Sequence, residues 1–423
     1  MLDIKYVINN QGVIEKSCNA RGIKVNINQF LQAYDKLRKS KKDLDDLRMN
    51  RNLLTNELNA LKKKKQNIKT LILKSKKNNL KIKKQEEIFK KLEKEYKLLS
   101  YQLPNPLHKN VPLGQKDNID WESKIKKPQF DFKPKNNWEV LIDLDLADFK
   151  RGIKAAGDRG WVLKGKAARL VRAINTYGFD FFGKKGYSEL IPPYFVNEEN
   201  LYITGHYPGG EKEVYKTEDG KVFVATGEIS VLAIFRDDTF NKKELPKKFM
   251  AYTPCFRREA GTHADDKGLY RTHQFDKIEL THITTKEKEE KEFYQIFEDL
   301  KEFYQSLGLP HRIITHRADD MPNKATMEKD IEVWLAAEKR WGEVGSIGMT
   351  GSFQARRGNI RCIGEGEKEF VHTIYATGCV ANRIMIAILN NFQTKNNEIE
   401  IPKVLHKYTG FKKIEKPTRR DKL

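Results

Sequence analysis

Leucines recur three, four or seven positions apart along a stretch of the chain, residues 28–103, that contains no proline, glycine or tryptophan. The series consists of Leu37, Leu44, Leu47, Leu54, Leu58 and Leu61. This spacing predicts a helix with one apolar seam, as in a coiled coil. Polar residues at 65–69 and 74–79 interrupt the pattern, and a second apolar series then runs from Ile88 to Leu103. The pattern predicts an antiparallel two-helix hairpin that ends at Pro104, because proline cannot continue a helix.

Strand-like and helix-like patterns alternate after Trp138, which favours an α+β catalytic or binding domain. We expect an amphipathic helix over 167–182, strands over 221–225, 248–256 and 273–283, and an apolar helix within 374–392. The residues between the hairpin and this region are rich in proline and lysine and predict a polar linker. The predicted division is therefore an N-terminal domain at 1–110, a linker at 111–136 and a larger domain at 137–423.

The composition narrows the class of protein. Hydrophobic residues make up 39% of the chain and charged residues 33%, so a sizeable core and a strongly hydrated surface are both expected. No apolar run approaches the roughly 18 residues of a membrane span, and no membrane partner is predicted. The four cysteines are scattered and show no CxxC spacing, which predicts no zinc site and fits a reducing, cytoplasmic location.

The formal net charge of +22 is concentrated on the predicted hairpin. No Asp or Glu occurs between Leu58 and Gln85, and this interval contains eleven lysines. A like-charged block repels itself, which favours an anionic partner such as nucleic acid, although a hydrated lysine-rich surface remains the alternative. The lysines that we expect to contact nucleic acid are Lys62, Lys63, Lys64, Lys65, Lys69, Lys74, Lys76 and Lys77.

The strongest chemical pattern is the string 254–261, Pro-Cys-Phe-Arg-Arg-Glu-Ala-Gly, followed by 271–279, Arg-Thr-His-Gln-Phe-Asp-Lys-Ile-Glu. A polar loop, Thr262–Gly268, separates two predicted strands. Alternation along a strand would place Arg257 and Glu259 on one side. This pairs a permanent cation for a phosphate with a carboxylate for a base or an amine. Either residue alone would more often form a surface ion pair.

The whole ordered string resembles motif 2 of the class II aminoacyl-tRNA synthetases, in the form found in the seryl branch. The segment 186–193 resembles motif 1 of that family, and 375–383 resembles motif 3. The resemblance implies an N-terminal coiled-coil arm followed by a catalytic domain built on an antiparallel sheet flanked by helices. It also implies a homodimer through the motif 1 region around Pro193.

The resemblance further implies roles for individual residues at an ATP site. Arg257 would bind the α-phosphate and the amino-acid carboxylate, and Arg383 the γ-phosphate, so these two are the expected catalytic residues. Glu259 would accept from the adenine amino group and Phe275 would stack on the purine. Glu343 and Ser346 would hold Mg²⁺. The full set of ATP-binding residues is Arg257, Arg258, Glu259, Thr272, Phe275, Glu343, Val344, Gly345, Ser346 and Arg383.

A serine pocket is implied by residues from three separate strings, and its buried acceptors would select a substrate hydroxyl. These residues are Thr226, Gly227, Glu228, Arg257, Glu279 and Thr377. The chain departs from the family pattern at Tyr375, where asparagine is usual, at Asn382, and in the run 347–351. These departures concern the shape of the side-chain pocket rather than the ATP contacts.

The implied function is ATP-dependent conversion of L-serine to seryl-adenylate and transfer of the seryl group to the 3′ end of tRNA(Ser). Positioning and charge stabilisation suffice for such a reaction, so no nucleophile or general base is expected. Two alternatives remain at this point. One is a paralogue that loads a small amino acid onto an acceptor other than tRNA, and the other is a non-catalytic, synthetase-like protein that binds tRNA.

Overall fold

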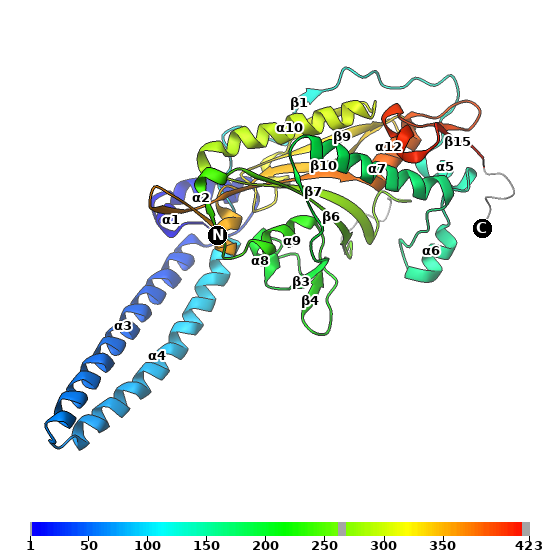
Figure 1. Ribbon diagram of the computed structural model, residues 1–423. Helices are drawn as coiled ribbons and strands as arrows, with labels where there is room; N and C mark the ends of the chain where they lie inside the picture. Colours follow the sequence, from blue (N-terminus) through cyan, green and yellow to red (C-terminus); the bar gives the residue numbers. More distant parts are fainter. Residues whose placement is uncertain (1, 261–267, 417–423) are drawn as a thin grey trace. The chain divides into compact units, whose positions relative to one another are not determined.

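Two long antiparallel helices dominate the N-terminal part of the computed structural model (Figure 1), which describes residues 2–260 and 268–416. The chain divides into two compact units, Leu2–Pro104 and Asn105–Leu423. The helices of the first unit are α1 (Ile4–Asn9), α2 (Gln11–Ala20), α3 (Ile27–Lys63) and α4 (Lys69–Gln102). The predicted two-helix hairpin is therefore confirmed.

The predicted leucine seam is the face of α3 that packs against α4. All six leucines of the series are buried or half-buried, whereas Leu53, outside the series, is 60% exposed. Near the start of α3 and the end of α4, Phe30 stacks on Tyr96 with 5.3 Å between ring centroids. Apolar burial along a single seam holds the hairpin together, as in a two-stranded coiled coil.

The predicted interruption at 74–79 was wrong, because α4 runs through it without a break. Asn78 is buried there, and its Nδ2 donates to the carbonyl oxygen of Leu47 at 3.0 Å. Its Oδ1 accepts from Nδ2 of Asn50 at 3.2 Å. A buried amide with its hydrogen bonds satisfied inside a helix pair restricts the register of the two helices, so this polar position belongs to the seam.

An eight-stranded sheet forms the centre of the second unit, in the order β1-β8-β9-β10-β13-β7-β6-β2. Every neighbouring pair is antiparallel except β2 with β6, which confirms the predicted class of fold. The strands are β1 (Asn118–Glu122), β2 (Ser188–Leu190), β6 (Lys247–Phe256), β7 (Gln274–Thr284), β8 (His311–Thr315), β9 (Met327–Leu335), β10 (Arg340–Met349) and β13 (His372–Val380). Strand β1 lies within the stretch predicted as a polar linker.

Helices pack on both faces of this sheet (Figure 1), with α7 and α10 along one face and α8 and α9 on the other. The helices are α5 (Asn137–Asp143), α6 (Phe149–Ala156), α7 (Gly165–Lys184), α8 (Asn200–Thr204), α9 (Gly227–Ile234), α10 (Glu289–Ser306), α11 (Phe353–Gly358), α12 (Ala381–Asn391) and α13 (His406–Thr409). Short strands complete the unit: β3 (Phe195–Asn197), β4 (Lys221–Phe223), β5 (Thr239–Asn241), β11 (Arg361–Gly364), β12 (Glu367–Phe370), β14 (Ile399–Glu400) and β15 (Lys413–Ile414).

The described residues also form the 3₁₀ turns η1 (Lys242–Glu244), η2 (Lys286–Lys288), η3 (Ala318–Asp320) and η4 (Lys403–Leu405). Within residues 2–260 and 268–416, no helix combines the length and the apolar composition that crossing a bilayer requires. The predicted loop Thr262–Gly268 lies outside the described residues, apart from Gly268.

The apolar helix predicted within 374–392 is confirmed as α12, and it is preceded by a strand that was not predicted. Residues up to Val380 belong to β13, which pairs with β7 and β10, and α12 begins at Ala381. Both halves are almost entirely buried. Burial on all sides removes the period that separates strand from helix in a sequence, which explains why the strand was not predicted.

The hairpin seam gives the first prediction. Replacing Leu44, which is 4% exposed, with alanine should lower the local unfolding free energy of the hairpin by about 2–5 kcal/mol, because buried methyl groups are lost. Replacing Leu53 on the same helix should change it by less than about 0.5 kcal/mol. Hydrogen exchange of the α3 and α4 amides measures both values. Equal effects of the two substitutions would contradict the assignment of the seam.

Candidate active site

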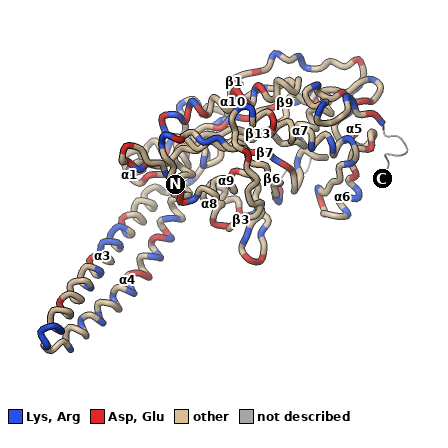
Figure 2. Tube along the Cα trace, in the orientation of Figure 1, with Lys and Arg blue, Asp and Glu red and all other residues tan. Residues whose placement is uncertain are grey.

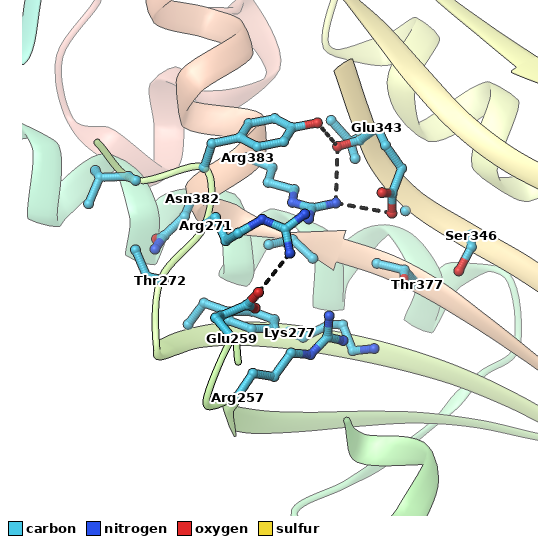
Figure 3. Close-up of a pocket in the computed structure, with 16 residues that line it drawn as sticks. Arg257, Glu259, Arg271, Thr272, Lys277, Glu343, Ser346, Thr377, Asn382 and Arg383 are labelled. Atoms are coloured by element: carbon cyan, nitrogen blue, oxygen red, sulfur yellow. Dashed lines mark hydrogen bonds and ion pairs between the residues drawn. The ribbon is translucent and has the colours of Figure 1, made fainter. Parts of the chain in front are cut away.

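The adjoining ends of β6 and β7 form one corner of a pocket in the second unit (Figure 3). The two strands pair up to Phe256 and Gln274, and Arg257 follows directly on β6. The Arg257 amide donates to the carbonyl oxygen of His273 at 2.9 Å, and its Nε donates to the carbonyl oxygen of Ala225 at 3.2 Å. Backbone and side chain of Arg257 are therefore both fixed at the edge of the pocket.

Glu259 reaches the same pocket by a different route from the one predicted. Strand β6 ends at Phe256, and Glu259 has a left-handed backbone with φ of 47°, so alternation along a strand no longer applies. The prediction that alternation aligns Arg257 with Glu259 was therefore wrong, although both line the pocket. The Glu259 carboxylate accepts from Nη1 of Arg271 at 2.6 Å, and this ion pair sets its position.

Phe275 and Thr272 line the pocket as expected, and Arg258 points elsewhere. The guanidinium carbon of Arg257 lies 5.1 Å from the Phe275 ring centroid, so the ring covers one side of the cation. The guanidinium carbon of Arg258 instead lies 5.9 Å from the ring centroid of Tyr215. Among the described residues, Arg258 is not part of the pocket wall.

Arg383 and Glu343 lie next to each other in the opposite wall of the pocket (Figure 3). Nη1 of Arg383, in the first turn of α12, lies 3.0 Å from Oε1 of Glu343 on β10. The same nitrogen donates to the Glu343 carbonyl oxygen at 3.1 Å. The charge of Arg383 lowers the pKa of the Glu343 carboxyl. The Tyr270 hydroxyl also donates to that carbonyl, at 2.7 Å, and the Tyr270 ring lies under the Arg383 guanidinium.

Two irregularities in the sheet shape this wall. The register of β10 with β9 shifts between Glu343 and Gly345, and the register of β13 with β7 shifts between Thr377 and Cys379. Such bulges redirect side chains locally. A Cβ on Gly345 would lie 2.8 Å from the Cβ of Thr377, so only glycine permits this approach of the two strands. Val344, Gly345 and Ser346 all line the pocket.

A second pocket adjoins the first, and four residues line both. These shared residues are Arg257, Lys277, Ser346 and Thr377. The rest of the second pocket is lined by Gly205, His206, Thr226, Glu228, Glu279, Pro322, Lys324, Glu328 and Tyr375. The predicted ATP and serine residues thus separate into two neighbouring cavities with Arg257 at the junction. Of the residues predicted to bind serine, Gly227 is not among the described residues that line the second pocket.

Glu279 is a buried carboxylate that lines the second pocket. It is 1% exposed, and Oε2 accepts from Thr226 Oγ1 at 2.6 Å and lies 2.5 Å from Nζ of Lys277. Burial raises the pKa of the Glu279 carboxyl, and the Lys277 ammonium opposes that shift. A Cβ on Gly227 would lie 3.0 Å from the Glu279 Cβ, so this glycine lets α9 approach β7 closely.

Tyr375, the largest departure from the family pattern, is accommodated by a glycine opposite it. Tyr375 pairs with Gly348 across β13 and β10, and a Cβ on Gly348 would lie 2.3 Å from the tyrosine ring. The Tyr375 hydroxyl donates to Oε1 of Glu328 at 2.8 Å. The ring therefore forms a fixed wall of the second pocket.

Several lining residues carried no predicted role, among them Lys277, Tyr270 and Lys324. The first had a usable signal, because Phe275, Lys277 and Glu279 alternate along β7 and must share a face. Tyr270 and Lys324 lie outside the strands, where no period applies. Their place in the site depends on tertiary structure alone.

Two family models match the chain. The model described as "Seryl-tRNA synthetase N-terminal domain" matches residues 1–107, and "tRNA synthetase class II core domain (G, H, P, S and T)" matches residues 214–392. These regions contain the hairpin and nearly all of the two pockets.

Curated relatives agree with both matches. The serine–tRNA ligase of Desulforapulum autotrophicum is 35% identical over 97% of this chain and 98% of its own length. That of Fervidobacterium nodosum is 38% identical over 82% of this chain and 83% of its own. The seryl-tRNA synthetase of Pyrococcus horikoshii, solved in complex with ATP, superposes with a TM-score of 0.87 at 28% identity and covers 99% of this chain and 100% of its own. The chain belongs to the seryl-tRNA synthetase family.

Proposed function

We propose that this chain uses ATP to convert L-serine to seryl-adenylate and then transfers the seryl group to the 3′ end of tRNA(Ser). The observation that carries the proposal is the junction of the two pockets at Arg257, Lys277, Ser346 and Thr377. An amino acid in one pocket and ATP in the other would bring a carboxylate and an α-phosphate together beside two cations. The relatives named serine–tRNA ligase, and the related structure complexed with ATP, support the same reaction.

The chemistry needs positioning and charge stabilisation. A serine carboxylate oxygen attacks the α-phosphorus, the new P–O bond forms, and pyrophosphate leaves with the electrons of the broken bond. The planar guanidinium of Arg257 can donate two hydrogen bonds to the oxygens that carry the developing charge. Its hydrogen bond to the carbonyl oxygen of Ala225 holds the guanidinium in place. A ribose hydroxyl of the tRNA end then attacks the carbonyl carbon and releases AMP.

In this proposal the first pocket receives ATP. Phe275 stacks on the purine, Glu259 accepts from the adenine amino group, and Arg383 binds the γ-phosphate. Val344 and Gly345 line the phosphate side with Thr272. Arg258 faces Tyr215 and is not among the described residues that line this pocket, so any contribution that it makes to ATP binding is indirect.

The donor set of the first pocket fits Mg²⁺ at Glu343 and Ser346. One carboxylate and one hydroxyl on the same strand are hard oxygen ligands, and Mg²⁺ commonly combines one or two protein ligands with substrate phosphates. In the described part of the chain, no group of three or more His, Cys, Asp or Glu side chains suits a metal ion, so phosphate oxygens would complete the shell. Bound Mg²⁺ would neutralise phosphate charge during the transfer.

The second pocket receives serine. The carboxylate of serine lies toward Arg257, and its ammonium and hydroxyl face the polar wall formed by Thr226, Glu228, Glu279 and Thr377. Buried acceptors of this kind discriminate against an analogue that lacks the hydroxyl. Gly227 supports the wall by allowing α9 to lie close to Glu279.

The hairpin supplies the tRNA contact in this proposal. All eight expected lysines are exposed around the turn between α3 and α4 (Figure 2), and Lys62 and Lys63 lie in the last turn of α3, where the helix dipole favours cations. The organisation proposed is a tRNA-binding domain at 1–110, a linker at 111–136 and a catalytic domain at 137–423. Homodimerisation would use the region of Pro193, which is exposed beside β2.

A cytoplasmic location completes the proposal. The four cysteines, Cys18, Cys255, Cys362 and Cys379, are buried free thiols, which suits a reducing compartment.

A charging assay tests the whole function. The protein, ATP, Mg²⁺ and labelled serine should attach label to total tRNA through an alkali-labile ester. Label on another small acceptor but not on tRNA would contradict the proposal and favour a paralogue with a different acceptor. Binding of tRNA without any serine-dependent turnover would favour a non-catalytic protein.

Arg383 provides a test of the ATP half. The variant Arg383→Lys keeps the positive charge but loses the planar guanidinium and its paired donors. The kcat of serine-dependent pyrophosphate exchange should therefore fall by about 10²–10³-fold, with little change in KM for serine. The matched control is Arg340→Lys, because Arg340 also lies against the Tyr270 ring but does not line either pocket. Equal losses in the two variants would contradict a phosphate role for Arg383.

The hairpin lysines provide a test of the tRNA half. Replacing residues 62–65 with alanine should weaken tRNA binding and reduce the slope of log affinity against log salt by roughly 0.7–0.9 for each lost phosphate contact. Pyrophosphate exchange should persist, because these side chains belong to the other unit. The matched control replaces Lys90, Lys91, Lys94 and Lys97, which are exposed on α4 among acidic residues, and should change the slope less. Parallel loss of exchange and tRNA binding would contradict the assignment.

A further inference from the structure

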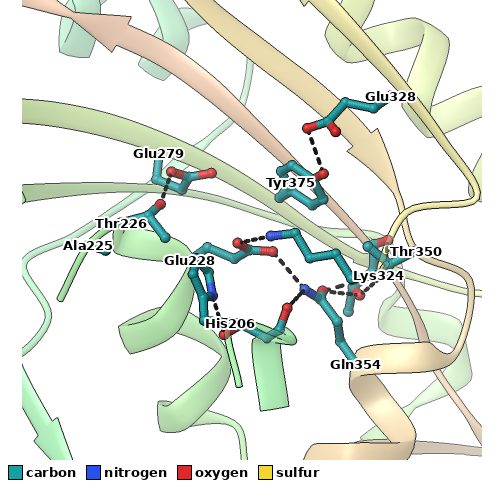
Figure 4. Close-up of polar contacts among 12 residues, drawn as sticks. His206, Ala225, Thr226, Glu228, Glu279, Lys324, Glu328, Thr350, Gln354 and Tyr375 are labelled. Carbon is teal, nitrogen blue, oxygen red and sulfur yellow. Dashed lines mark hydrogen bonds and ion pairs between the residues drawn. The ribbon is translucent and has the colours of Figure 1, made fainter. Parts of the chain in front are cut away.

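Lys324 places an ammonium group inside the wall of the second pocket (Figure 4). It precedes β9 in the chain, is 8% exposed and lines the pocket. Its Nζ lies 2.5 Å from Oε2 of Glu228 and 3.8 Å from the ring centroid of Tyr375. Glu228 is 1% exposed, so the two charges form a buried pair. A buried carboxylate and ammonium in this geometry neutralise each other.

The second oxygen of Glu228 is also occupied by a donor of the chain. Nε2 of Gln354 donates to Oε1 of Glu228 at 2.6 Å and to the carbonyl oxygen of Thr204 at 3.2 Å. Oε1 of Gln354 in turn accepts from Thr373 Oγ1 at 2.7 Å, which fixes the orientation of the amide. Both oxygens of Glu228 are therefore engaged by side chains that are themselves held in place.

Glu279 differs from Glu228 in how its oxygens are used. The bonds that Glu279 receives from Thr226 and Lys277 both end on Oε2. Lone pairs of Oε1 can therefore receive a donor from a substrate. The two carboxylates of one pocket are thus unequal: neither of these donors to Glu279 uses Oε1, whereas each oxygen of Glu228 already accepts a donor, from Lys324 or Gln354.

We propose that Lys324 is a specificity-determining residue that occupies Glu228 and so makes the pocket select a neutral hydroxyl side chain over a cationic amine. The inference rests on the proposed function. The amine isostere of serine is 2,3-diaminopropionate, which carries an ammonium where serine carries its hydroxyl. Beside Lys324 that ammonium meets a like charge, and Glu228, the carboxylate next to Lys324, is already neutralised. Such a repulsive element raises specificity without adding a contact to the preferred substrate.

The test compares serine with 2,3-diaminopropionate in pyrophosphate exchange, as the ratio of their kcat/KM values. Lys324→Met removes the ammonium and leaves Glu228 with a free charge, so the ratio should shift toward the diamino acid by on the order of tenfold. The double variant Glu228→Gln/Lys324→Met removes that charge and should return the ratio toward the wild-type value, whatever its absolute rate. Lys324→Arg keeps the cation and is the matched control.

Two results would overturn the inference: an unchanged ratio in Lys324→Met, or a shifted ratio that persists in the double variant. A purely structural role for Lys324 would lower the rates with both substrates and leave their ratio unchanged. Lys324→Gln keeps a polar end group against Glu228 and serves as a second neutral variant if Lys324→Met does not fold. Exchange by the wild-type protein with serine checks the proposed function separately, because its absence would reject both that function and this inference.

Discussion

Strand β7 and its antiparallel register with β6 and β13 are the constraint on which the site depends. Phe275, Lys277 and Glu279 share the face of β7 that borders both pockets. Pairing with β6 brings Arg257 to the corner, and pairing with β13 sets Thr377 opposite Glu279. A slip of one residue would turn the polar side chains of β7 away from the pockets. The buried strands around β7 restrict that slip, because their apolar side chains would leave the core.

Ion pairs hold the charged side chains of the site in position in the absence of substrate. Arg383 pairs with Glu343, Arg271 with Glu259, Lys277 with Glu279, and Lys324 with Glu228. Arg383, Arg271 and Lys277 line the first pocket and are thereby held beside the proposed ATP site. Preorganised charges need little rearrangement during reaction, which makes their stabilisation of the transition state effective. Pairing recovers part of the cost of burying these charges.

Sequence patterns predicted the elements that bury only one face. The leucine seam of α3 and the amphipathic helix that became α7 have clear helical periods, and the strands of motif 2 have clear boundaries. The same reasoning did not predict the strand at 374–380, because burial on every side removes the period from the sequence. The interruption predicted at 74–79 was wrong for a different reason. Asn78 is polar, but a polar residue whose hydrogen bonds are satisfied can occupy an apolar seam.

Some residues of the candidate site could be predicted from the sequence and others could not. Residues in ordered strings, such as Arg257, Glu343 and Arg383, could be predicted because the strings themselves are distinctive. Lys324 could not, because it enters the pocket from a loop, and only the folded sheet brings it to Glu228.

The central claim is that two adjoining pockets combine ATP with serine, and ATP–pyrophosphate exchange without tRNA measures it directly. Each of the twenty amino acids is supplied in turn to the full-length protein with ATP and Mg²⁺. The account predicts exchange with serine and background exchange with the other nineteen. Exchange with no amino acid, or with a different one in preference to serine, would contradict it.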